Sequence, residues 1–105
     1  MSNLKGYEVM YLLDPELEEE GLDEKKERIK SIVESGEGEV QSIEEWGKKR
    51  LSYEIQGFNR GLYLLVEFEA SSDDIDEISD KSNVEEGVIR YQIFRNDELP
   101  EAVSA

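Results

Sequence analysis

The chain has 105 residues, which suffices for one domain with a single hydrophobic core but not for two. It contains no Cys and no His, which excludes disulfides, thiolate metal sites, the usual zinc sites and histidine acid–base catalysis. Its formal net charge is −15. The lack of Cys favours the cytoplasm. The N-terminal MSNLKGYEVMYLL is too short and aromatic for a signal peptide, and no apolar run could span a bilayer, so we expect a soluble cytoplasmic protein.

The charges are separated along the chain. Residues 14–45 carry 4 cations against 13 carboxylates, and residues 67–87 carry 1 cation against 9 carboxylates. The balance reverses in residues 46–66, with 4 cations and 1 carboxylate, and in residues 88–95, with 2 cations and no carboxylate. The cations therefore lie among the apolar segments, whereas the acids gather in two other segments.

The first half of the chain predicts a strand, a helix and a second strand. Tyr7 to Leu13 is a short apolar run closed by Asp14-Pro15, as is typical of a strand. Strong helix formers follow from Leu17 to about Ser35, with an acidic outer face and apolar residues near helical spacing. Val40 to Ile55 is strand-like but is interrupted by Gly47, which predicts a bulge or a bend.

The second half predicts a hairpin, a short helix and a last strand. Gly57 to Gly61 has the composition of a hairpin connection, and Leu62 to Phe68 is apolar enough for a strand in the middle of a sheet. Ser71 or Ser72 is a suitable N-cap for a short helix with an apolar stripe at Ile75 and Ile78. Val88 to Phe94 predicts the final strand.

The resulting order β-α-β-β-α-β is the split βαβ pattern of ferredoxin-like domains. We therefore expect an α+β fold in which a four-stranded antiparallel sheet carries two helices on one face, with strands one and three in the middle. The other face stays open and would expose residues such as Tyr63 and Leu65. Residues 1–95 form this single domain, and residues 96–105, NDELPEAVSA, are expected to be a short flexible acidic tail.

Several segments together resemble one known family. These are GYEVMYLLDPEL near the start, EEWGKKRLSYEIQG and RGLYLLVEFEA in the middle, and GVIRYQIFR at the end. In order and without large gaps, they are similar to the family of the bacterial ribosomal small-subunit protein numbered six. The run GKKRLSYEI, residues 47–55, resembles the family signature of glycine, basic residues, leucine, a small residue, tyrosine and isoleucine.

The resemblance implies a non-catalytic domain without cofactors that joins the platform of the small ribosomal subunit. There it would bind small-subunit (16S-type) ribosomal RNA together with the basic small-subunit protein numbered eighteen. This chain departs from the family in its charge, since −15 is acidic even for one of the less basic ribosomal proteins. We expect this excess acid to suit a salty cytoplasm, in which screening weakens charge repulsion.

The candidate RNA-binding residues are first the cations of the strand-like segment, Lys48, Lys49 and Arg50, which Arg60 at the hairpin can join. In a regular strand Lys48 and Arg50 point away from the face of Tyr53 and can reach phosphates without disturbing the core. The alternative interpretation is a solvated strand edge whose charges discourage sheet-to-sheet aggregation.

Further candidates lie in the sheet strands. Arg90 and Arg95 have opposite parity, so only one of them can share the open face with a given neighbour, and we favour Arg90. Aromatic side chains can stack on bases or on a partner, although strand tyrosines more often serve packing. These interface candidates are Tyr7, Tyr53, Tyr63 and Tyr91.

Three functions compete on this fold: a ribosomal RNA- and protein-binding module, a stand-alone RRM-like single-stranded RNA-binding module, and a small enzyme. The RRM reading is weakened because RGLYL, residues 60–64, has leucine at two positions where aromatic residues are needed. No glycine-rich phosphate loop or nucleophile motif supports an enzyme. The acidic run DDIDEISD lacks the register of a calcium loop, so we expect no metal site.

Overall fold

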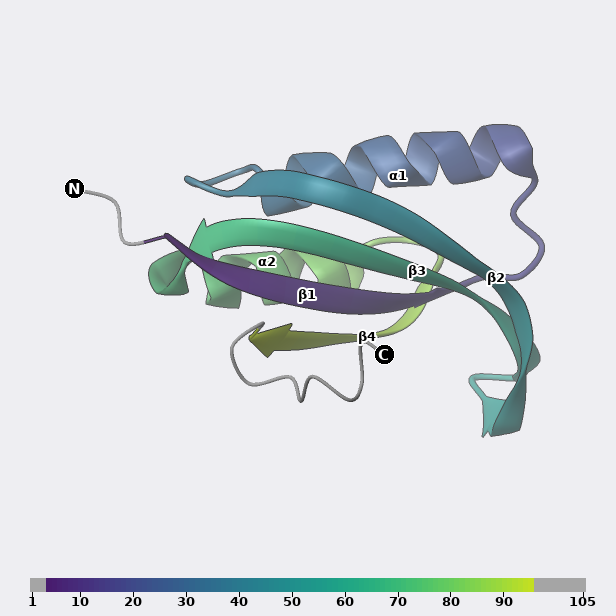
Figure 1. Cartoon of the computed structure of the whole chain (residues 1–105). Coiled ribbons are helices and arrows are strands. Elements are labelled where there is room, and N and C mark those ends of the chain that lie inside the picture. Colours follow the sequence, from purple (N-terminus) through teal and green to yellow (C-terminus); the bar gives the residue numbers. More distant parts are fainter. Residues whose placement is uncertain (1–3, 96–105) are drawn as a thin grey trace.

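The computed structural model describes residues 4–95 (Figure 1). Its elements follow the order β-α-β-β-α-β, with one turn of 3₁₀ helix, η1, before the second helix. They are β1 (Leu4–Leu13), α1 (Glu19–Val33), β2 (Glu39–Ile55), β3 (Phe58–Ser71), η1 (Ser72–Asp74), α2 (Ile75–Val84) and β4 (Val88–Arg95). The predicted tail, residues 96–105, lies outside the described residues. Within residues 4–95, no helix is long and apolar enough to cross a membrane.

The strands form one antiparallel sheet in the order β2-β3-β1-β4. Strands one and three are therefore central, and the ferredoxin-like prediction is confirmed. The β1–β3 ladder runs from Leu4 opposite Ser71 to Leu13 opposite Leu62, with Tyr7 opposite Phe68 between them. Because directly paired residues share a face, this register decides which side chains meet the helices and which lie on the other face.

Both helices cover the same face of the sheet (Figure 1). That face carries alternate residues of β1 and β3, and it packs against apolar residues of α1 and against Ile78 of α2. The sheet residues buried in this core are Tyr7, Val9, Tyr11, Leu13, Leu62, Leu64, Val66, Phe68 and Ala70. The Tyr11 hydroxyl is hydrogen-bonded to Ser82 Oγ of α2 at 2.7 Å, which satisfies both polar groups inside the core.

The two sequence expectations for irregular backbone had different outcomes. Gly47 does mark a bulge: the β2–β3 register shifts between Glu45 and Gly47, and Gly47 has φ +85°, which a glycine adopts without strain. The hairpin connection is shorter than predicted, because only Gln56 and Gly57 form the turn, with φ +50° and +86°. Two residues with positive φ are typical of a tight hairpin turn.

The short turn lets β2 and β3 extend beyond the end of β1. Pairing of β1 with β3 stops at Leu62, whereas β3 continues to Phe58 and still pairs with β2. Residues 48–61 therefore form a two-stranded ribbon, here called the hairpin arm, which curves away from the plane of the sheet (Figure 1). Arg60 lies in a strand of this arm and not in a loop.

The start of the second helix agrees with the sequence. Ser71 is the N-cap of η1, and its hydroxyl accepts a hydrogen bond from the Asp73 N–H at 3.3 Å. Asp73 and Asp74 lie in the first turn, where carboxylates interact favourably with the exposed N–H groups of a helix. Capping thus fixes where the chain leaves β3 and turns back over the sheet.

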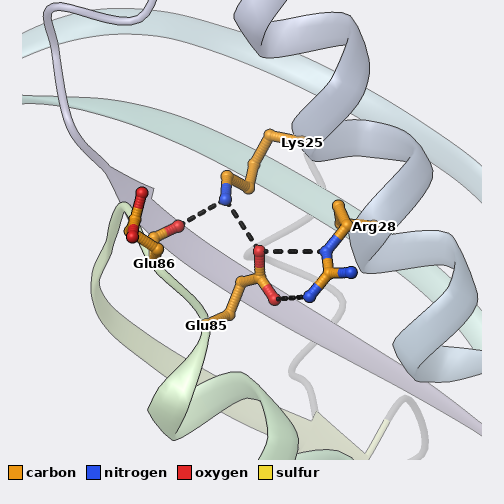
Figure 2. Close-up of polar contacts among 4 residues, drawn as sticks. All are labelled: Lys25, Arg28, Glu85 and Glu86. Atoms are coloured by element: carbon orange, nitrogen blue, oxygen red, sulfur yellow. Dashed lines mark hydrogen bonds and ion pairs between the residues drawn. The ribbon is translucent and has the colours of Figure 1, made fainter.

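A nearly buried carboxylate connects α1 to the segment between α2 and β4 (Figure 2). The Glu85 side chain is only 7% exposed and receives Lys25 Nζ at 2.8 Å and Arg28 Nη2 at 2.9 Å. Lys25 also donates to the Glu86 carbonyl oxygen. The hydrogen bond from Arg28, reinforced by Lys25, lowers the pKa of Glu85 despite burial.

We predict that Glu85→Gln lowers the free energy of unfolding by about 2 kcal/mol, because two cations then face a neutral amide at a buried position. Arg28→Gln should cost much less, since the Arg28 side chain is 67% exposed and solvent screens its charge. The matched control is Glu86→Gln, because only the backbone carbonyl of Glu86 is engaged. Urea unfolding at pH 7 measures all three, and equal effects of Glu85→Gln and Glu86→Gln would contradict the prediction.

The same group predicts a dependence on pH. Because the folded-state pKa of Glu85 is depressed, its contribution to stability is present above the ordinary Glu pKa of about 4.3 and is lost as the pH falls through the folded value. The stability difference between wild type and Glu85→Gln should therefore shrink between pH 7 and pH 3. A difference that stays constant over this range would show that packing, not charge, accounts for it.

The acidic helix layer predicts that stability rises with salt. Residues 14–45 and 67–87, which include both helices, hold 13 and 9 of the 27 carboxylates, and molar KCl screens their mutual repulsion. The urea midpoint should increase from low to molar KCl. The control Glu24→Lys/Glu27→Lys, on the exposed face of α1, should reduce this increase. A midpoint that falls or stays flat with KCl would refute the idea.

Candidate nucleic-acid interface

The cations of the hairpin arm differ from those of the helices. Four of the five helix cations pair with carboxylates, Lys25 and Arg28 with Glu85, Lys26 with Glu45 and Lys81 with Glu77, whereas Lys30 is exposed at the end of α1. The arm cations are exposed, and within residues 4–95 their side chains form no ion pair or hydrogen bond. They are Lys48, Lys49, Arg50 and Arg60. In a chain of net charge −15, these side chains remain available to an anion.

The register distributes the arm cations over two faces. Lys48 pairs with Leu62 and Arg50 with Arg60, so these cations lie on the side of the sheet that holds the helices. Lys49 pairs with Gly61 and lies on the opposite side. Lys48 and Arg50 thus point away from the face of Tyr53.

The surface beside Lys48, Arg50 and Arg60 contains two concavities. Arg50, Asn59 and Arg60 line a concavity of about 300 Å³. A neighbouring concavity of about 380 Å³ includes Lys48, Arg60 and Glu16 of the loop after β1. Two cross-strand arginines and a nearby amide offer several N–H donors to a phosphate backbone. This arrangement can hold a nucleic-acid strand by its phosphates without reading its sequence.

The other side of the arm closes over the open face. Gln56 Nε2 donates to the Ile89 carbonyl oxygen at 3.1 Å, and Arg90 Nη1 donates to the Tyr53 hydroxyl at 3.3 Å. Both bonds connect the arm to β4, at the opposite edge of the sheet. Between them and the central strands lies a hollow of about 270 Å³ with a largely apolar lining that includes Met10, Leu12, Ile55, Tyr63, Arg90 and Phe94.

The side chains predicted from the sequence to bind RNA or a partner differ in the face of the sheet on which they lie and in their exposure. Arg90 shares the open face with Phe94, while Arg95 is paired with Tyr7 on the helix side. Tyr53 is 62% exposed. Tyr63 and its neighbour Leu65 are half-buried, so the expectation that they are exposed was too strong. The strands themselves screen part of each side chain.

The remaining tyrosines serve packing. The Tyr91 hydroxyl donates to the Ser79 carbonyl at 2.9 Å and is hydrogen-bonded to the Ser79 hydroxyl at 2.6 Å, which holds β4 against α2. Tyr7 is 4% exposed and stacks on Phe68 with ring centroids 5.7 Å apart. Neither ring is presented to a ligand in the way that Tyr53 is.

Sequence reasoning missed Trp46, which is 46% exposed on the edge strand β2. Its indole N–H donates to Glu44 Oε1 at 3.1 Å, and it lies at the register shift just before Gly47. A bulged strand leaves the extra residue outside the regular alternation of faces. The detectable signal was a lone Trp next to a glycine and a run of cations.

The end of the open face far from the hairpin turn is acidic. Glu8 and Glu67 are directly paired across the central strands, and Glu44 is paired with Leu65 on the same face. Partial burial, followed by repulsion from Glu67 and Glu44, raises the pKa of Glu8. The open face is therefore negative at one end and apolar with nearby cations at the other.

The fold and its unpaired cations define a small ferredoxin-like domain with a basic hairpin arm. The family model described as "Ribosomal protein S6" matches residues 6–95. The chain therefore belongs to the ribosomal protein S6 family, a family of the small ribosomal subunit.

Individual relatives agree with this membership. The small ribosomal subunit protein bS6 of Natranaerobius thermophilus is 37% identical over 95 residues, which cover 90% of this chain and 99% of the relative. The bS6 protein of Caldanaerobacter subterraneus is 38% identical over 95 residues, or 90% and 100% of the two chains. The crystal structure of 30S ribosomal protein S6 from Thermotoga maritima superposes with a TM-score of 0.83 at 29% identity, covering 97% of this chain and 96% of that one.

The raised pKa of Glu8 yields a prediction. A group that binds its proton more tightly in the folded state stabilises the fold at low pH, and this contribution is lost as the pH rises through the folded pKa. At pH 7 the ionised Glu8 therefore opposes folding. Glu8→Gln should raise the urea midpoint at pH 7, with a smaller gain at pH 4. The exposed Glu24→Gln is the control, and destabilisation by Glu8→Gln at pH 7 would contradict the prediction.

Proposed function

We propose that this chain is a structural component of the small ribosomal subunit that binds small-subunit (16S-type) rRNA together with the basic small-subunit protein eighteen. Membership of the S6 family supports the subunit and implies a place on the cytoplasmic ribosome. The observation that carries RNA binding is the set of unpaired cations on the hairpin arm of an otherwise acidic chain. The basic protein partner rests on the resemblance described above.

The arm suits RNA phosphates for two reasons. Its cations project from a ribbon that extends beyond the end of β1, so a nucleic-acid strand can reach them without crossing the central sheet. Arg50 and Arg60 are cross-strand neighbours, and such a pair of like charges is favourable only when an anion lies between or beside them. The concavity that they line offers a place for that anion.

The stand-alone RRM-like alternative has less support. An RRM stacks bases on aromatic residues of the open face of its central strands. On β3 that face carries Tyr63, Leu65 and Glu67, only one of which is aromatic, and Glu67 is paired with Glu8. Carboxylates on the two central strands repel phosphates, so we assign RNA contact to the arm instead.

We further propose that the chain is not an enzyme. It has no His or Cys to act as a general base or an activated nucleophile. The carboxylates whose pKa values are shifted act in other ways: Glu85 is neutralised by two cations, and Glu8 lies among like charges.

The test of RNA binding is the triple variant Lys48→Gln/Lys49→Gln/Arg50→Gln. Exposed edge cations change stability by about 0.5 kcal/mol or less when replaced, so its thermal melt should match wild type. Each lost phosphate contact should reduce the log–log salt slope of binding to a small-subunit rRNA fragment by roughly 0.7 to 0.9. In competition with wild type, the variant should enter small subunits poorly.

The matched control, Lys5→Gln/Lys30→Gln/Lys81→Gln, removes the same charge from outside the arm and should leave incorporation unchanged. Equal incorporation of the arm variant and wild type across a salt series would show that the arm is only a solvated strand edge and does not bind RNA. An arm variant that melts early would show that these side chains support the fold instead.

A further inference from the structure

The concavity of about 380 Å³ between the hairpin arm and the loop that follows β1 is here called the loop concavity. The loop contributes Pro15 and Glu16 to its lining, and the arm contributes Lys48, Phe58 and Arg60. Phe58 and Arg60 are two residues apart on β3 and therefore share a face of the ribbon. The loop concavity thus combines an aromatic ring, two cations and one carboxylate.

These charged groups have no partners inside the part of the chain that the structure describes. No ion pair or side-chain hydrogen bond within residues 4–95 involves Lys48, Arg60 or the Glu16 carboxylate. A simple anion would be repelled by Glu16, and a simple cation would be repelled by Lys48 and Arg60. The ligand that fits this lining carries an anionic group at one end and N–H donors at the other.

The loop itself fixes the position of Glu16. The Leu17 N–H donates to the Asp14 carbonyl oxygen at 3.3 Å, and the Glu16 N–H donates to Asp14 Oδ1 at 2.9 Å. Pro15 presets φ at the second position of this turn, and Leu17 packs against the hydrophobic core. Because the turn is already ordered, little conformational freedom is lost when the Glu16 carboxylate meets a ligand.

We propose that the loop concavity binds one unpaired guanine nucleotide of RNA. The base stacks on Phe58, the N1–H and N2–H groups of its Watson–Crick edge donate to the Glu16 carboxylate, and the adjoining phosphates contact Lys48 and Arg60. Guanine is the one RNA base with two adjacent N–H donor groups on that edge, which a single carboxylate accepts together. The inference rests on the proposed function, which supplies the RNA, and adds recognition of a base to it.

The two concavities of the arm divide affinity from specificity. Arg60 lines both of them, so they adjoin, and a strand whose base enters the loop concavity can place a neighbouring phosphate between Arg50 and Arg60. Phosphate contacts position a strand without reading its sequence, whereas contacts to base edges read it. Glu16 is therefore the specificity-determining residue, and the arm cations supply most of the affinity.

The deciding test measures the affinity of the full chain for two short RNA strands, UUUGUUU and UUUIUUU. Inosine (I) lacks only the N2 amino group of guanosine. Wild type should bind the guanosine strand about tenfold more tightly, the discrimination expected of one bidentate pair. Glu16→Gln should abolish this preference by weakening binding of the guanosine strand. If Glu16 acted only as a charge, Glu16→Gln would strengthen binding of both strands alike, and that result overturns the inference.

Two further variants serve as controls for charge. Glu18→Gln removes the same charge from an exposed residue that makes no side-chain cap hydrogen bond and does not line the loop concavity. It should leave the preference for guanosine unchanged. Lys48→Gln should weaken binding of both strands by the same factor, because the phosphates are common to them.

Phe58→Leu tests the stacking. Loss of the ring should weaken binding of the guanosine and inosine strands alike, by about tenfold, because every base has a face that stacks. A variant that melts as wild type does and binds both strands with unchanged affinity overturns the inference. If Phe58→Leu instead melts early, Glu16→Gln still decides the matter, since Glu16 is exposed and its carboxylate has no partner within residues 4–95.

The outcomes separate this inference from the proposed function. If wild type binds neither the short strands nor the small-subunit rRNA fragment, the proposed function fails and the inference fails with it. If wild type binds the rRNA fragment but shows no preference for the guanosine strand over the inosine strand, only this inference is overturned, and the arm contacts phosphates alone.

Discussion

The pairing of β2 with β3 beyond the end of β1 is the constraint on which the candidate interface depends. A tight turn at Gln56-Gly57 lets both strands continue as a two-stranded ribbon, and the bulge at Gly47 bends it. Such a ribbon is weak alone. Here, Gln56 and Tyr53 are hydrogen-bonded to β4, which stabilises the curved position. The pairing of β2 with β3 thus places Lys48, Arg50 and Arg60 on one face, and the other face of the arm closes a hollow.

Charge separation follows from this geometry. The helices occupy one layer, where cations are largely neutralised within the chain, as Glu85 neutralises Lys25 and Arg28. The arm extends away from that layer and has fewer acids near it. A domain of net charge −15 can therefore keep a local positive surface, because screening limits the reach of distant carboxylates to about 10 Å at 0.1 M salt.

Much of this could be predicted from sequence, because period-two and helical patterns are local. They gave the element order, the central strands and a cap at Ser71 or Ser72, of which Ser71 is the one observed, and the choice of Arg90 over Arg95 for the open face was correct. The arm was missed because polar, glycine-containing Gly57 to Gly61 has the composition of a loop, although β3 begins at Phe58. The hollow and the internal role of Tyr91 depend on contacts distant in sequence, which no local pattern contains.

The position of β1 in the sheet has a consequence for how the chain is made. β1 comes from the beginning of the described chain, yet one of its two neighbours is β4, with Tyr7 opposite Arg95. During synthesis, the hydrogen-bonding edge of β1 that later receives β4 has no partner until almost the whole domain has been translated. Contacts of such long range slow folding. The sheet is therefore completed only after β4, the last strand of the domain, has been synthesised, and until then this edge of β1 stays unpaired.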